Sequence, residues 1–249
     1  MAWQPMEINP EMLNKVLSRL GVGPGWRFVD VLGFEEEALG AVPTPACALL
    51  LLFPLTEQHE NFRKQQTEKI KNQEINSKVY FLKQTVSNSC GTIGLIHAVA
   101  NNKDKLNLDE GSVLKKFLDE TAGLSPEERA KHFANNKVED NSVNFHFILF
   151  ANVDGHLYEL DGRMPFPVNH GTSSADLLLK VRLLSLAACL PGNKAYRRAR
   201  AMHSVYRSCA GLLLTLCKQG STVPQSKWRI AGTALGNPAY LTVIGEGTQ

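Results

Sequence analysis

The sequence has no long hydrophobic run, and it has little cysteine and no glycine-rich phosphate-binding loop. Its longest apolar run, residues 46–53, has eight residues, far short of the ~20 that a membrane-spanning helix needs. No basic stretch followed by an apolar one opens the chain, so a secretory signal is not expected. The five cysteines lack CxxC or Cys/His spacing, which excludes a disulfide scaffold and a zinc site. These absences predict a cytoplasmic protein with no transmembrane segment, no metal and no cofactor.

Acidic residues are almost absent from residues 181–249, which hold nine lysines and arginines but a single acid, Glu246. Residues 1–180 hold 18 lysines and arginines against 23 acids, so the net charge of +3 combines an acidic body with a basic tail. We therefore expect two regions, 1–180 and a divergent, weakly specified tail, 181–249. The arginine-rich run 197–200 is more typical of a solvated stretch than of a nucleic-acid site, so no nucleic-acid partner is expected.

Hydrophobic patterning predicts helices and strands that intermix along the chain. The predicted helices are 9–21, 58–73, 90–100, 112–120 and one that starts at the capping box of Ser125 and Glu128. The predicted strands are 26–32, 46–53, 79–82, 143–150 and 157–160, the last two joined by an Asp154-Gly155 turn. This order favours an α/β (α+β) fold with a mostly antiparallel sheet flanked by helices on both faces.

Cys90 is the candidate nucleophile, because it lies in the first turn of a predicted apolar helix. The helix dipole and unpaired N–H groups there favour thiolate over thiol. Gln84, six residues upstream, could donate to an oxyanion beside the N–H of Cys90. The alternative, a small buried cysteine with a packing role, applies to Cys47 in its predicted core strand.

His146 is the candidate general base, because it interrupts an otherwise apolar strand. With a two-residue turn at Asp154-Gly155, Asp161 lies diagonally across the hairpin from His146, within side-chain reach. The pair could orient an imidazole for catalysis, or it could be a structural buried pair. His97 is too far along the helix from Cys90 and is expected to be a packed residue. Four other histidines, which lie in polar stretches or turns, are expected to be exposed: His59, His132, His156 and His170.

These motifs give residues 1–180 a close resemblance to the small ubiquitin carboxyl-terminal hydrolases, most of all to their neuronal L-type members. The resemblance is carried by the sequence segments at 5–10, 26–30, 51–54, 88–97, 143–146 and 154–163. It implies a knotted, papain-like cysteine peptidase fold, and thiol-dependent hydrolysis at the C-terminal glycine of ubiquitin. It also implies a nucleophile, a general acid/base, an orienting carboxylate and an oxyanion donor, respectively Cys90, His146, Asp161 and Gln84. A ubiquitin-contacting segment is implied at Pro5, Met6, Glu7, Ile8, Asn9 and Pro10.

The sequence departs from the family pattern at two places. The family's crossover loop before the histidine strand is longer than the connection here, 134–142. Similarity ends near Lys180, and nothing in 181–249 matches the family's final helix and strand, although 240–244 could imitate a strand. A missing central strand would leave backbone groups unpaired and could prevent folding. A catalytically impaired ubiquitin-binding variant is therefore the alternative to an active hydrolase.

Overall fold

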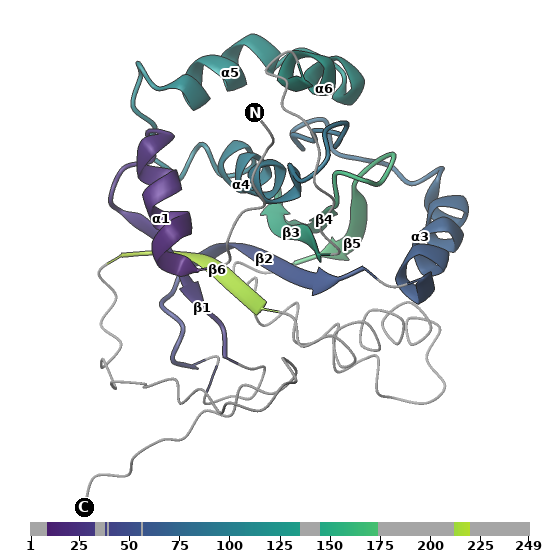
Figure 1. Cartoon of the computed structure of the whole chain (residues 1–249), viewed down its shortest axis with the longest axis horizontal. Helices are drawn as coiled ribbons and strands as arrows, with labels where there is room; N and C mark the ends of the chain where they lie inside the picture. Colours follow the sequence, from purple (N-terminus) through teal and green to yellow (C-terminus); the bar gives the residue numbers. More distant parts are fainter. Residues whose placement is uncertain are drawn as a thin grey trace, which may run out of the picture.

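A computed structural model describes residues 9–32, 38, 40–55, 57–134, 145–173 and 212–219. Within them, six strands form an antiparallel sheet in the order β1-β6-β2-β3-β4-β5 (Figure 1). The strands are β1 (Trp26–Asp30), β2 (Ala46–Pro54), β3 (Phe145–Val153), β4 (His156–Leu160), β5 (Val168–Thr172) and β6 (Leu212–Lys218). The helices are α1 (Pro10–Arg19), α3 (Glu57–Ile70), α4 (Cys90–Ala100), α5 (Val113–Thr121) and α6 (Pro126–Ala134). The predicted combination of an antiparallel sheet and intervening helices is confirmed.

The two faces of the sheet are covered by different helices. Alternate side chains of β2 and β3, such as Leu50 and Leu149, join a cluster that also contains residues of α1, α4 and α5. Their neighbours, such as Leu51 and Ile148, join a second cluster on the opposite face. On that face Phe53 meets His59 of α3, with ring centroids 4.6 Å apart. Helix α4 is apolar on all sides and buried along most of its length, so it forms the centre of the fold.

Local sequence signals fix most of the element ends. Asn9 caps α1, its side chain accepting a hydrogen bond from the N–H of Glu11 at 2.8 Å. The β3–β4 hairpin turns at Asp154 and Gly155, both with positive φ, and pairs Val153 with His156 as predicted. These signals were readable because each depends on a few neighbouring residues.

The predicted capping box at the start of α6 is present and gives a modest test of the fold. Ser125 Oγ accepts from the N–H of Glu128 at 3.3 Å, and the carboxylate of Glu128 accepts from the N–H of Ser125 at 2.8 Å. Ser125→Ala should lower the free energy of unfolding by about 1 kcal/mol. Thermal unfolding should show a Tm decrease of about 2–4 °C. Ser77→Ala, at an exposed serine with no cap, is the control, and an equal decrease in both variants would contradict the capping role.

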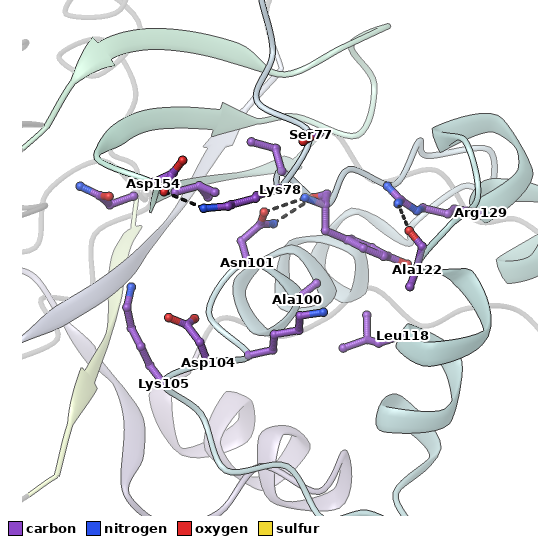
Figure 2. Close-up of a pocket in the computed structure, with 15 residues that line it drawn as sticks. Ser77, Lys78, Ala100, Asn101, Asp104, Lys105, Leu118, Ala122, Arg129 and Asp154 are labelled. Carbon is purple, nitrogen blue, oxygen red and sulfur yellow. Dashed lines mark hydrogen bonds and ion pairs between the residues drawn. The ribbon is translucent and has the colours of Figure 1, made fainter.

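The predicted strand at 79–82 is wrong: this buried segment belongs to no strand, and its backbone pairs with side chains instead. Asn101 at the end of α4 accepts from the N–H of Tyr80 at 2.8 Å and donates to its carbonyl at 2.9 Å (Figure 2). His97 Nε2 accepts from the N–H of Leu82 at 2.9 Å, and Arg129 donates to the carbonyl of Phe81 at 3.1 Å. The apolar pattern was correct about burial, but it cannot show which groups satisfy the backbone.

Strand β6 comes from the region 181–249, in which the sequence showed no match to the family's final strand. It lies between β1 and β2, pairing Phe28 with Leu216 on one side and Leu50 with Leu214 on the other. Leu214 and Leu216 are almost fully buried, and the buried hydroxyl of Thr215 donates to the carbonyl of Ala48 at 2.9 Å. The sheet is therefore complete between β1 and β2. The segment 240–244 lies outside the described residues, and the boundary near residue 180 stays a prediction.

Two other features bear on the search for a site. No helix in the described part of the chain is both long and apolar enough to cross a membrane. A pocket of about 600 Å³ opens beside Asn101 (Figure 2). Asn101 caps the C-terminal end of α4, whereas Cys90 begins the helix. Since Gln84, Cys90, His146 and Asp161 do not line this pocket, it is separate from the predicted site.

Candidate active site

Cys90 is the first residue of α4, as predicted, and it is half-buried. The preceding residue, Ser89, does not cap the helix: its hydroxyl donates to the carbonyl of Val86 at 2.7 Å. The first-turn N–H groups are therefore not taken up by a capping side chain, and they add to the positive end of the helix dipole. This leaves a thiol and backbone donors together at one helix end.

His146 and Asp161 form a buried pair, with 2.6 Å between Nε2 and Oδ1. His146 lies at the start of β3, opposite Phe53 in the register, and Asp161 directly follows β4. Both side chains are almost inaccessible to solvent. The backbone N–H of Arg163 also donates to Asp161 Oδ1, at 2.9 Å, so the carboxylate is held from two directions. The hairpin geometry inferred from the sequence is confirmed.

The electrostatics of the site favour a charged thiolate and imidazolium. Burial raises the pKa of the Cys90 thiol. A hydrogen bond to His146 and the charge of that ring lower it by more than burial raises it, so the net shift of the pKa is downward. Burial lowers the pKa of His146, but Asp161 and Cys90 outweigh burial and raise it to about 9. The pKa of Asp161 is well below its ordinary value, because His146 and Arg63 overcome the effect of burial. The site therefore keeps its proton on the imidazole at neutral pH.

Gln84 lies beside this group, although no hydrogen bond joins it to Cys90, His146 or the Asp161 side chain in the described structure. Its N–H donates to the carbonyl of Gly162 at 2.7 Å. Its side-chain Nε2 donates to the carbonyl of Val86 at 3.3 Å, which uses one of the two amide hydrogens. The second hydrogen is left for another acceptor. Of the predicted site residues, Cys90, His146 and Asp161 are thus brought together directly, and Gln84 through the backbone after Asp161.

A buried polar network behind Asp161 was missed by the sequence analysis. Arg63 of α3 forms an ion pair with Glu159, and its Nε lies 3.6 Å from Asp161 Oδ2. His170 Nε2 lies 2.8 Å from the other Glu159 oxygen. Burial opposes ionisation of Glu159, but Arg63 and His170 lower its pKa to about 2. Arg63 therefore compensates two neighbouring buried carboxylates. Its only sequence signal was a charged residue on a helix that otherwise looked solvated.

Two of the expected exposed histidines belong to this network, so those expectations are wrong. His59 is only 4% exposed, and its Nε2 accepts from Arg63 Nε at 3.3 Å. Burial and Arg63 lower the pKa of His59 to about 4. His170 is half-buried against Glu159. His132 is exposed as expected. His156 beside the turn is half-buried, so the expectation of exposure is wrong there too.

The packing roles predicted for His97 and Cys47 are confirmed. His97 is fully buried and stacks on Phe81, with ring centroids 5.3 Å apart. Burial lowers its pKa to about 4, so the ring stays neutral. Cys47 is buried in β2, where burial raises its pKa to about 12 and keeps the thiol protonated. In the described chain, no group of three histidine, cysteine or acidic side chains is placed to hold a metal.

A helix that begins with a cysteine, packed on an antiparallel sheet that carries a histidine–aspartate pair, is the architecture of papain-like cysteine hydrolases. A family model described as ubiquitin carboxyl-terminal hydrolase, family 1, matches residues 3–184. The chain belongs to this family.

Comparisons with individual proteins agree. The chain is 69% identical over 195 residues to human ubiquitin carboxyl-terminal hydrolase isozyme L1, covering 72% of this chain and 87% of that protein. It is 60% identical over 224 residues to the Bos taurus isozyme L1, covering 72% and 89%. The fold is similar to the crystal structure of the Trichinella spiralis UCH37 catalytic domain bound to ubiquitin vinyl methyl ester. That match has a TM-score of 0.60 at 20% identity and covers 88% of this chain and 97% of the other.

Proposed function

We propose that this chain hydrolyses bonds to the C-terminal glycine of ubiquitin, with Cys90 as nucleophile and His146 as general acid and base. Asp161 orients His146, and Gln84 donates to the oxyanion. The observation that carries the proposal is the 2.6 Å contact of His146 with Asp161 beside a cysteine whose pKa is lowered at a helix start. The family to which the chain belongs supplies the substrate class.

The reaction follows from the charge state of the site. The Cys90 thiolate attacks the glycine carbonyl carbon, and the oxyanion accepts from the N–H of Cys90 and the free amide hydrogen of Gln84. The bond between the carbonyl carbon and the leaving group breaks as His146 donates its proton to that group. Water then attacks the thioester while His146 takes its proton, and the thiolate leaves. No cofactor enters these steps.

The segment Pro5 to Pro10 is proposed to contact ubiquitin. Pro5, Met6, Glu7 and Ile8 lie outside the described residues. Asn9 and Pro10 are described, and both begin α1: Asn9 caps it and Pro10 is its first residue. We also propose a cytoplasmic location, because a reducing compartment protects a nucleophilic thiol from oxidation.

The proposal is tested by the hydrolysis of ubiquitin that carries a C-terminal aminocoumarin. The purified full chain should release the fluorophore with saturable kinetics, and Cys90→Ser should release none. His132→Gln, at an exposed histidine away from the site, should match the unmodified chain. Ubiquitin binding without release would instead favour the impaired variant that the short connection between α6 and β3 suggested. If a demonstrably folded chain neither binds ubiquitin nor releases the fluorophore, both the hydrolase proposal and the impaired-variant alternative are contradicted.

A further inference from the structure

Gly162 lies where three parts of the candidate site meet. It directly follows Asp161, and its carbonyl accepts from the N–H of Gln84 at 2.7 Å. A Cβ at this position would lie 3.1 Å from Gln84 Cβ, 3.1 Å from Ile93 Cγ2 and 3.3 Å from the Gln84 nitrogen. Ile93 is one helical turn after Cys90 on α4. Because Gly162 has no side chain, the segments that carry Asp161, Gln84 and Cys90 can approach one another closely.

The requirement for glycine here is one of space. Gly155 and Gly171 have positive φ, which an alanine would adopt only with strain, but Gly162 does not. An alanine could take the backbone conformation of Gly162, and its methyl group would then displace its neighbours by a few tenths of an ångström.

The loop that carries Gly162 has little freedom to move away. The N–H of Arg163 donates to Asp161 Oδ1 at 2.9 Å, and the N–H of Met164 donates to the Asp161 carbonyl at 2.9 Å. Gly162 is itself buried and lies within the turn that the hydrogen bond from Met164 to Asp161 closes. A methyl group would therefore push on Gln84 and on Ile93.

We propose that Gly162 is a positioning residue that sets the place of the Gln84 amide relative to Cys90. This inference rests on the proposed function, since it assumes that Gln84 donates to an oxyanion. The misplacement of a reacting group by about 1 Å costs about 100-fold in rate. A shift of a few tenths of an ångström should therefore cost about 3- to 10-fold in kcat and leave KM unchanged.

The test compares Gly162→Ala with Gly123→Ala, whose added Cβ would have no neighbour within 4 Å. Three reactions of the full chain are measured. The first is the hydrolysis of ubiquitin aminocoumarin, which gives kcat and KM. The second is acylation of Cys90 by p-nitrophenyl acetate, in which the thiolate attacks the carbonyl and p-nitrophenolate leaves. The third is alkylation of Cys90 by iodoacetamide, which displaces iodide and forms no oxyanion. Peptide mass spectrometry identifies the Cys90 adducts.

In Gly162→Ala, kcat and acylation should fall together by about 3- to 10-fold while alkylation matches the unmodified chain. In a Gln84→Ala background, Gly162→Ala should cause little further loss, because its effect passes through the amide. Equal losses of acylation and alkylation, or an undiminished effect without the amide, would overturn the inference. So would rates like those of the unmodified chain. If the unmodified chain fails on the ubiquitin substrate, the ratio of acylation to alkylation still decides the role of Gly162.

Discussion

A chain that ends at Gly211 is expected to lose cooperative folding, because it lacks β6. This strand lies inside the sheet and pairs with β1 and with β2. Its loss exposes the backbone donors and acceptors of both neighbours and removes the buried Leu214 and Leu216. Each fully buried leucine contributes about 1.5–3 kcal/mol. A domain has only about 5–15 kcal/mol of total stability. Circular dichroism during urea unfolding should show no cooperative transition.

The matched control for this truncation is a chain that ends at Gly220. It loses most of the remaining tail but keeps β6, so it should unfold with a urea midpoint close to that of the full chain. If the chain ending at Gly211 unfolds at the same midpoint as this control, the assignment of β6 to the centre of the sheet is wrong.

Asp161→Asn is expected to lower kcat by about 100- to 10,000-fold, because an amide does not fix the tautomer or stabilise the charge of His146. The variant should also shift the pH dependence. Burial lowers the pKa of His146, and Asp161 is the main group that opposes this effect. The pKa of His146 is about 9 in the unmodified chain and should therefore be lower in the variant. Activity is lost as pH rises through this pKa, since the leaving group then receives no proton. The alkaline limb should therefore move to lower pH.

Profiles of kcat/KM from about pH 5 to about pH 10 measure this shift. Asp154→Asn is the control on the same hairpin: this exposed carboxylate pairs with Lys78 at 2.9 Å and follows the end of β3 opposite to His146. It should leave both the rate and the alkaline limb unchanged. An alkaline limb that stays near pH 9 in Asp161→Asn would show that Asp161 does not control the protonation of His146.

The candidate site was predictable from the sequence because each part depends on short-range geometry. Cys90 follows from the position of a cysteine at a predicted helix start. The pairing of His146 with Asp161 follows from the length of one turn. Both inferences use only the spacing of residues that are close in the sequence, and the observed hairpin register agrees with the predicted pairing.

The parts that were not predictable depend on contacts distant in sequence. Arg63 and Glu159 are 96 residues apart, and neither has a local pattern that identifies its partner. The segment at 79–82 was correctly expected to be buried, but its backbone pairs with side chains of α4 and α6. Strand β6 is a short leucine-rich run interrupted by Thr215, which periodicity cannot distinguish from a buried helix. Its position between β1 and β2 is set by two strands from the other end of the chain.

Covalent labelling of the full chain by ubiquitin vinyl methyl ester, followed by peptide mapping, tests directly whether Cys90 is the nucleophile that acts on ubiquitin. We expect one ubiquitin adduct on Cys90, and almost none in Cys90→Ser or at the buried Cys47. Prior alkylation of Cys90 by iodoacetamide should block the adduct. An unlabelled Cys90 in a folded chain, or an adduct on another cysteine, would show that Cys90 is not the nucleophile that acts on ubiquitin.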